Sequence, residues 1–303
     1  MSISVLLTCH NRREKTVNCL TSLGRALESY NRLHEGSERV ALEIYLVDDG
    51  CTDGTAEAAR AVVDYAPLHI LQGDGNLYWA GGMRFCWREA MKRHDDWDYY
   101  LLLNDDVELL ENVFDELFDA QRYSVEYFGK EGIVSGITCA KDNPEKLTYG
   151  GSVWVNRFLA TQKRLVPDGK PQLCDLTNAN VLLVPAQVVD EVGIFDNRYR
   201  HGAADYDYSF RVRKAGFPVV LTAHFCGKCN NDHFNPQTVA DKVMKMSLSQ
   251  RKDYFEHPLH SNRDYLHYIW QTSPMRYPMV WVGRKLNVYF PKLYYTFSGV
   301  RKG

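Results

Sequence analysis

The chain has 303 residues, of which 45% are hydrophobic and 24% charged, a composition typical of a globular protein rather than a disordered or collagen-like one. Because 36 Lys and Arg residues face 38 Asp and Glu residues, the net charge is -2, and we expect no nucleic acid as a partner. The eight cysteines are scattered along a long chain, which is typical of reduced thiols in the cytoplasm, without disulfides. The amino-terminal apolar run is too short for a secretory signal, and no run reaches the roughly 18 apolar residues of a membrane span.

Apolar runs alternate with helical patterns over roughly the first 140 residues. We expect helices at 12–30, 55–66 and 81–93, the first because Val17, Leu20, Leu23 and Leu27 recur at helical spacing. Short apolar runs predict buried strands at 3–8, 42–49, 68–73 and 98–106. This alternation predicts an α/β fold with a doubly wound, mostly parallel sheet.

The pattern changes after residue 133. Shorter and more mixed strands predict an antiparallel extension on the acceptor side, over the carboxyl edge of the first sheet, followed by a helix at 204–215 and a strand at 217–222. The stretch 236–271 has a helical pattern. We therefore divide the chain into an α/β domain at 1–232 and a helical carboxyl-terminal region at 233–303.

The end of the chain has an unusual composition. From Tyr265 to Gly303 there is no Asp or Glu, and six Lys and Arg residues are interleaved with aromatic ones. Basic residues mixed with aromatic ones favour the surface of an anionic membrane, so we expect peripheral contact through residues 274–303. A packed helix pair or a dimer interface is the alternative interpretation.

Acidic or amide-rich stretches follow several of the expected strands. They are CHNRRE at 9–14, VDDGCTDGT at 47–55, LLLNDDVEL at 101–109 and HGAADYDYSFR at 201–211. Ligands of open α/β sheets bind at the carboxyl ends of the strands, and carboxylates placed there indicate a site for a metal-bound phosphate.

These stretches, together with GNLYWAGGMR at 75–84, resemble in order and spacing a family-2 inverting glycosyltransferase of the GT-A fold, over roughly residues 2–230. The nearest type is the bacterial polysaccharide, rhamnosyltransferase-like group. The resemblance implies a metal-dependent hexosyltransferase that moves a sugar from a nucleoside-diphosphate sugar, with UDP or dTDP, to a hydroxyl of a lipid-linked glycan. Such an enzyme works in cell-envelope polysaccharide synthesis, in the cytoplasm or on the cytoplasmic face of the inner membrane.

The resemblance places the metal-binding D-x-D element of the family at Asn104, Asp105 and Asp106. Asp106 is then the ligand of Mg²⁺ or Mn²⁺, and Asn104 and Asp105 help to hold the donor. In isolation, two acids after a strand are more often a turn or a helix cap. A third ligand is expected at His233, or else at His224. The spacing H-x-C-x2-C-x3-H at 224–233 also has the look of a zinc knuckle, which would need all four ligands to converge.

The resemblance also implies a nucleotide cradle. Asp49 accepts a hydrogen bond from the base, and Thr8 and Asn11 hold base and ribose. Gly81 and Gly82 let a helix start approach phosphate, and Arg84 meets base or diphosphate. The alternatives are a tight turn and helix cap around Asp49, and close packing of a helix on the sheet at the glycine pair.

The catalytic base of the family corresponds to Asp205, because an acceptor hydroxyl needs a carboxylate to take its proton. The acid that usually precedes the base is Ala204 here. Asp207 is expected to orient the helix and to pair with Arg211 one turn later.

Two other classes of protein stay open, a non-catalytic nucleotide-sugar binder and a sugar-1-phosphate nucleotidylyltransferase. The second would carry a glycine-rich loop after the first strand, where this chain has TCHNRRE without glycine.

Overall fold

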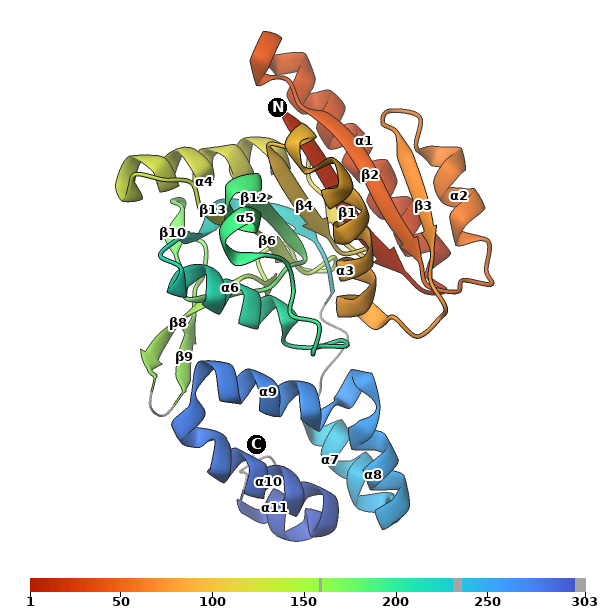
Figure 1. Cartoon of the computed structure of the whole chain (residues 1–303), viewed down its shortest axis with the longest axis vertical. Helices are drawn as coiled ribbons and strands as arrows, with labels where there is room; N and C mark the ends of the chain where they lie inside the picture. The colour runs from red at the N-terminus through yellow and green to blue at the C-terminus, as the bar shows by residue number, and fades with distance from the viewer. Residues whose placement is uncertain (158–159, 231–235, 298–303) are drawn as a thin grey trace.

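The computed structural model describes residues 1–157, 160–230 and 236–297. Its centre is a curved ten-stranded sheet with the order β10-β13-β6-β12-β4-β1-β2-β3, in which β5 pairs with β13 and β7 with β6 (Figure 1). The predicted α/β class with a mostly parallel sheet is confirmed. The strands of the sheet are β1 Ser2–Cys9, β2 Ala41–Asp48, β3 Leu68–Gln72, β4 Tyr99–Leu103, β5 Glu108–Leu109, β6 Ile133–Cys139, β7 Leu147–Tyr149, β10 Gln172–Leu173, β12 Val181–Pro185 and β13 Val219–Lys228.

The first four long strands are parallel. β1 lies between β2 and β4, and β3 forms the outer edge beyond β2. All five residues of β4 are buried, which fits the continuous apolar run expected of a strand covered on both faces. The strand predicted at 98–106 ends at Leu103, so Asn104, Asp105 and Asp106 belong to the turn that follows it.

The second half of the sheet is mixed. β12 is antiparallel to β4 and to β6, as an antiparallel extension requires, but β6 and β13 are parallel to each other. The predicted strand at 217–222 is longer than its pattern indicated and continues to Lys228 through a register shift. A separate antiparallel sheet is formed by β8 Gly151–Asn156, β9 Thr161–Arg164 and β11 Leu176–Thr177, in the order β11-β8-β9.

Helices cover both faces of the sheet. One face packs against α1 Arg13–Leu33, α2 Thr55–Val62 and α4 Val113–Phe128, whose apolar residues join one core cluster. The other face packs against α3 Tyr78–Ala90, α5 Ala186–Val192 and α6 Ala204–Lys214. Burial of these apolar stripes on the sheet provides most of the driving force for this architecture.

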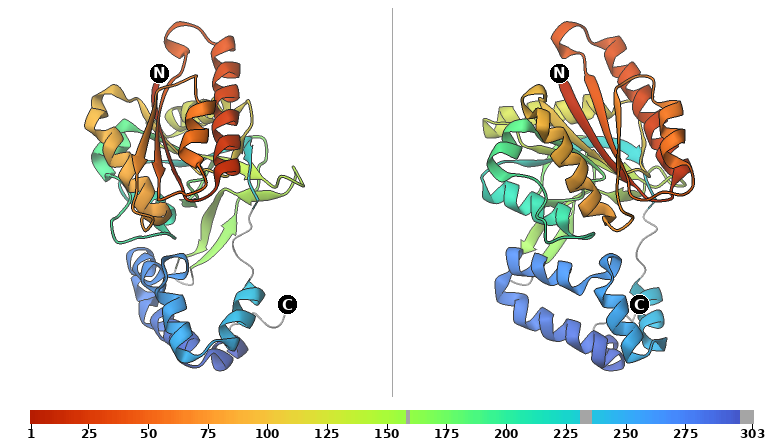
Figure 2. Two further views of the ribbon diagram at one scale, coloured as in Figure 1. Left: turned by 90° about the vertical axis from the view of Figure 1, so that its right-hand side faces the viewer. Right: turned by 45° about the vertical axis from the view of Figure 1, so that its right-hand side comes forward.

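The carboxyl-terminal region is a separate layer of helices. It contains α7 Pro236–Lys245, α8 Leu248–Glu256, α9 Asn262–Thr272, α10 Tyr277–Tyr289 and α11 Pro291–Phe297. Figures 1 and 2 place this layer below the α/β part, on the side of the sheet at which β1 and β2 end. In the described part of the chain, no helix combines the length and the apolar character that a membrane crossing requires. The predicted boundary after residue 232 lies outside the described residues.

Specific polar contacts join the helical layer to the α/β part. The buried carboxylate of Asp264 on α9 accepts hydrogen bonds from the backbone N–H groups of Arg200, at 2.8 Å, and His201, at 3.2 Å. The Tyr78 hydroxyl at the start of α3 lies 3.4 Å from Nε2 of His257. These contacts fix the layer beside the loop that leads into α6.

Candidate functional site

The centre of the candidate site is the turn Asn104–Asp106 after β4. Arg12, from the loop after β1, lies against this turn and donates to both carboxylates. Its Nη1 is 2.8 Å from Oδ1 of Asp105 and its Nη2 is 2.5 Å from Oδ2 of Asp106. The loop after β1 therefore brings a positive charge to the two acids, a partner that the motif CHNRRE contained but that sequence reasoning did not assign.

Asp105 points away from solvent. Its carboxylate is 3% exposed, and its Oδ2 lies 3.4 Å from the Thr16 hydroxyl of α1. The pKa of Asp105 is raised to about 7, chiefly by burial; the charge of Arg12 opposes this shift and the charge of Asp106 adds to it. Asp105 thus anchors Arg12 from the interior, and its expected contact with the donor stays a prediction.

Asp106 is the more available of the two acids. Its Oδ1 lies 3.5 Å from the thiol of Cys229, a weak donor, so this oxygen has no strong partner among the described residues. A Mg²⁺ or Mn²⁺ ion bound with a diphosphate needs only one or two carboxylates from the protein, and Asp106 fits that requirement. Within the described ranges no group of three His, Cys, Asp or Glu side chains is placed to hold a metal ion.

Asn104 is held by two neighbours. Its side-chain oxygen accepts a 2.7 Å hydrogen bond from the indole of Trp79 on α3, and its backbone N–H donates to the carbonyl of Asn180 at 3.0 Å. Asn104 therefore connects the acidic turn both to α3 and to the segment that precedes β12.

Asp205 lies at the start of α6, next to the amide of Asn178. Nδ2 of Asn178 is 3.4 Å from Oδ2 of Asp205, and Oδ1 of Asp205 accepts from the N–H of Tyr206 at 2.9 Å. Burial raises the pKa of Asp205, and these hydrogen bonds to its charged form oppose the shift. A carboxyl group with a raised pKa is better suited to act as a general base than an ordinary surface aspartate.

The segment 178–180 connects the two acids. Asn178 contacts Asp205, and Asn180, two residues later, has its Nδ2 4.0 Å from the sulfur of Cys229, which in turn contacts Asp106. Asp106 and Asp205, about a hundred positions apart in sequence, therefore lie at the same edge of the sheet. Asn178 lies in no motif, and Cys229 was noted only as part of the zinc-knuckle pattern, so sequence reasoning assigned neither residue to this site.

The residues near Asp205 include Ala204, which stands where the family usually has an acid. Ala204 is fully buried in the core cluster beneath α6, where an acid would be desolvated without a partner. Asp207 is also buried and pairs with Nε of Arg211 at 2.9 Å, one turn along the helix, as predicted. Arg211 in addition donates to the carbonyls of Val192 and Ile194, so this pair holds α6 to the end of α5.

Asp49 is surrounded by backbone donors. Its carboxylate accepts from the N–H groups of Gly75, Leu77 and Tyr78, at 2.9, 3.0 and 3.1 Å, and it is 3% exposed. These bonds shape the loop that leads into α3. Asp49 thus builds the wall of the expected nucleotide cradle by the turn chemistry that sequence reasoning considered as its alternative role.

Thr8 and Asn11 lie where the cradle was expected. Asn11 adopts a left-handed conformation, with φ 51°, and its side-chain oxygen accepts from the N–H of Thr52 at 2.8 Å, which ties the loop after β1 to the loop after β2. Thr8 packs against α3 at Gly82, where an added Cβ would lie 2.2 Å from the Thr8 hydroxyl oxygen. At Gly81 the nearest atom to such a Cβ would be 3.4 Å away, an ordinary contact.

Arg84 is turned away from this group. Its Nη1 donates to the backbone carbonyls of Asp196, at 3.0 Å, and Tyr199, at 2.6 Å, and the residue is 8% exposed. Arg84 therefore supports the loop before α6, because a buried guanidinium needs acceptors and the loop carbonyls supply them.

His224, one of the two histidines considered as a third metal ligand, contacts Glu116 rather than Asp106. Nδ1 of His224 lies 2.7 Å from Glu116 on α4, and the side chain is largely exposed. His233 lies outside the described residues. Cys226 is buried against Thr222, while Cys229 faces Asp106, so the three described residues of the zinc-knuckle pattern do not converge.

The fold and the sequence both have known relatives. A mannosyltransferase from Pyrobaculum calidifontis, PcManGT, in complex with GDP-Man and Mn²⁺, aligns at 13% identity with a TM-score of 0.52, over 99% of this chain and 84% of its own. Residues 1–349 of S. aureus TarS, in complex with UDP-GlcNAc, align at 12% identity with a TM-score of 0.55, over 100% and 91% of the two chains. These likenesses define the architecture as GT-A-like.

The amino-terminal part matches the model of a known family. The model of glycosyl transferase family 2 matches residues 4–126, which include β1 to β4 and the acidic turn. The predicted resemblance to family-2 glycosyltransferases is confirmed over this amino-terminal part of the chain. No curated protein sequence matches it.

Proposed function

We propose that this glycosyltransferase moves a hexosyl group from a nucleoside-diphosphate sugar, with UDP or dTDP, to a glycan hydroxyl, with inversion. The proposal rests above all on the contacts that join Asp106 and Asp205 at one edge of the sheet through residues 178–180. One carboxylate beside a metal-bound diphosphate and a second with a raised pKa are the two groups that a single displacement needs.

Each residue has a stated role in this proposal. Asp205 takes the proton of the attacking hydroxyl, and Asn178 orients its carboxylate. Asp106 holds a Mg²⁺ or Mn²⁺ ion, which when bound neutralises charge on the departing diphosphate. Arg12, which reaches both acids of the turn, adds a second positive charge at the same place. Thr8, Asn11 and the loop shaped by Asp49 hold the nucleoside.

The acceptor and the location of the enzyme are part of the same proposal. The helical layer bears many exposed large apolar residues, namely Trp270, Met275, Met279, Trp281, Val282, Tyr289, Phe290, Leu293 and Phe297. No acidic residue occurs from Tyr265 onwards, so an anionic membrane surface meets no repulsion there. We therefore place the enzyme at the cytoplasmic face of a membrane, on a lipid-linked glycan of the cell envelope.

Donor hydrolysis tests the proposal. With Mn²⁺ and a panel of nucleotide sugars, we expect the wild-type protein to release nucleoside diphosphate slowly from one of them. Asp106→Ala should lower this rate about 100-fold or more, because one preorganised charge partner is lost. Glu108→Ala, two residues later on the strand β5, is the matched control and should keep the rate. Binding of a donor without any release would instead identify a non-catalytic binder.

A further inference from the structure

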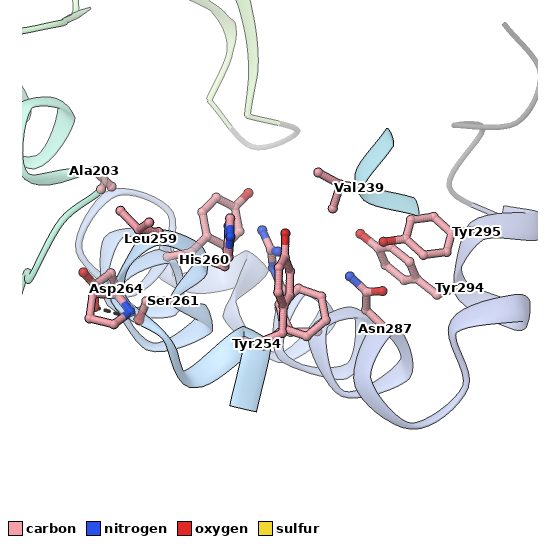
Figure 3. A pocket seen from close by; sticks show the side chains of 15 residues that line it. Ala203, Val239, Tyr254, Leu259, His260, Ser261, Asp264, Asn287, Tyr294 and Tyr295 are labelled. Atoms are coloured by element: carbon pink, nitrogen blue, oxygen red, sulfur yellow. Dashed lines mark hydrogen bonds between the residues drawn. The ribbon is translucent and has the colours of Figure 1, made fainter. Parts of the chain in front are cut away.

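A cavity of about 380 Å³ lies inside the helical layer and reaches the loop before α6. Figure 3 shows side chains from α7, α8, α9, α10 and α11 around it, with Ala203 at one side. Its volume is within the range of about 300–1,000 Å³ that is typical of small-ligand sites. Gly202 and Ala203 in its wall precede the proposed base Asp205 by three and two residues, so the cavity reaches the loop that leads to this base.

The lining combines aromatic rings with polar groups. Tyr254, Tyr265, Tyr294 and Tyr295 contribute rings, and Asn287 contributes an amide. Asn287 is only 4% exposed; its amide hydrogen-bonds the Tyr295 side chain, whereas its Oδ1 has no partner among the described residues. A buried acceptor without a donor is costly, so a ligand that brings a hydroxyl group to this oxygen gains a bond. Aromatic faces beside a hydrogen-bonding amide suit a sugar ring, which has both C–H and O–H faces.

A basic groove of about 680 Å³ adjoins the cavity, and Phe255 and Arg284 line both. The groove is lined by five cationic residues but a single acid, Glu256, and the cations are Arg200, Lys252, Arg263, Arg284 and Lys285. No ion pair between these five and a carboxylate occurs in the described part of the chain. Nε of Arg200 is buried and has no hydrogen-bond partner there either.

The charges of the groove are suited to an anion. Arg284 stacks on Tyr265 at 4.1 Å, and Lys285 lies 5.5 Å from the centre of the Trp281 ring, so both are held by rings rather than by acids. Five cations around one recess match the charge of a phosphate or diphosphate, whose oxygens accept several charge-assisted bonds at once. The exposed apolar residues Trp281 and Tyr289 form part of the same groove and continue it to the outer surface.

We infer that the helical layer binds the acceptor in two adjoining parts, a sugar ring in the aromatic cavity and a phosphate-bearing group in the basic groove. This inference rests on the proposed function, because it makes the layer the place from which the acceptor hydroxyl reaches Asp205. It adds the acceptor's chemical class, a glycan attached to a phosphate or diphosphate, and assigns its recognition to residues beyond the stretch that the family model matches.

The groove is tested with farnesyl diphosphate, titrated into the full chain by calorimetry. Arg263→Ala combined with Lys285→Ala should weaken binding about tenfold or more, because two charged partners of the phosphate are lost. The pair Lys245→Ala and Lys292→Ala, in the same layer but outside the groove, removes the same charge and should leave binding unchanged. Equal losses in both double variants, or none in either, would overturn the assignment.

Two further probes separate the sources of the anion. Inorganic pyrophosphate that binds as tightly as farnesyl diphosphate would support a site for the phosphate alone, whereas weaker pyrophosphate binding supports a lipid-linked phosphate. Farnesol that binds as tightly as farnesyl diphosphate would overturn the anionic site, because the recess would then recognise only the apolar chain.

The cavity is tested by saturation-transfer NMR with a panel of methyl hexosides. An added Cβ at Gly202 meets no atom within 4 Å, so Gly202→Leu should fill the cavity mouth without strain. We expect at least one hexoside to bind the wild type, its signal to be lost in Gly202→Leu, and the signal to persist in Met275→Ala on the exposed surface. Binding of none by the wild type, or an unchanged signal in Gly202→Leu, would overturn the cavity assignment.

Donor hydrolysis measured on the same preparations separates the two proposals. A wild-type protein that binds these probes but releases no nucleoside diphosphate from any nucleotide sugar would refute the transferase and leave the binding site. Hydrolysis with normal dependence on Asp106, but no binding of the probes, would refute the acceptor site and leave the transferase.

Discussion

Arg12 is the residue that most changes the electrostatics of the site. It is the ion-pair partner of both Asp105 and Asp106, at 2.8 and 2.5 Å, and its side chain is 31% exposed. A pair of adjacent carboxylates would repel each other without such a partner. The protein therefore keeps the acidic turn ordered before a donor arrives, and the positive charge is already in place when a diphosphate binds.

Asp205 gives the enzyme a predicted pH dependence. A base works in its ionised form, and burial raises the pKa of Asp205 above the ordinary value of about 3.9. The rate of transfer should therefore be maximal at pH values above this raised pKa and should fall about tenfold for each pH unit below it. A pH profile of kcat/KM measures this fall, which forms the acid limb of the profile. Asp205→Asn should lower kcat by about 100-fold or more.

Substitution of Asn178 should shift the pH at which kcat/KM falls. Its amide favours the charged form of Asp205, so Asn178→Ala should raise the pKa of the base and shift the acid limb to higher pH. A merely structural role for Asn178 would lower the rate at every pH and leave the limb where it was. A shift to lower pH would contradict the assignment of Asp205.

The sequence predicted the acids but not their partners. Asp106 and Asp205 follow from motifs, because the chemistry needs carboxylates at the ends of particular elements. Arg12 was visible in a motif without an assigned role, and Cys229 was not predictable because its contact with Asp106 depends on the register of β13, which runs past its expected end. Arg84 was expected at the ligand but supports a loop, since spacing along a helix does not show which acceptors lie opposite it.

At the scale of elements, α3 packs closely against β1 near the site. Trp79 of α3 donates to Asn104, and Thr8 of β1 lies against Gly82, so the position of α3 affects both the acidic turn and the cradle. The glycine pair therefore has a packing role at Gly82, as its alternative interpretation held, whereas Gly81 has room for a side chain.

The glycine pair provides a matched test of this packing. Gly82→Ala places a Cβ 2.2 Å from the Thr8 hydroxyl oxygen and should lower the free energy of unfolding by about 1–3 kcal/mol, as overpacking does. Gly81→Ala meets only ordinary contacts and should raise it by about 0.5–1 kcal/mol, because alanine is the better helix former. Urea unfolding measures both, and equal effects would refute the close contact.

The strands and helices themselves were largely predictable from hydrophobic periodicity. The alternation of β1, α1, β2, α2, β3 and α3 appeared in the expected order, because these elements have recognisable apolar patterns. The parallel pairing of β6 with β13 was not predictable, since these strands are separated by about eighty residues and their pairing is a property of the assembled sheet.

At the scale of the whole molecule, the helical layer lies across from the carboxyl ends of the parallel strands (Figure 2). Its contacts with the α/β part include those of Asp264, His257 and His267, and many of its exposed apolar and basic residues lie on α9, α10 and α11. This arrangement puts a surface suited to a membrane in the same layer as the proposed acceptor site.

Membrane association should therefore depend on salt. Vesicles with anionic lipids should bind the protein at about 0.1 M salt and release much of it at about 1 M, where the Debye length falls from about 10 Å to about 3 Å. Replacing Trp281 and Phe290 by Ser should weaken binding at both salt concentrations, because apolar contact is not screened. Co-sedimentation with vesicles measures both effects. No binding to anionic vesicles at low salt would favour the packed helix pair or dimer interface.

The order of the strands in the sheet has a consequence for synthesis on the ribosome. β4 has β1 as one neighbour, made long before it, but its other neighbour β12 is translated some eighty residues later, and Cys229 emerges later still. A nascent chain that has just released β4 therefore carries an unpaired strand edge next to its acidic turn. Truncation of the gene before codon 181 should for that reason yield an aggregating fragment rather than a smaller working enzyme.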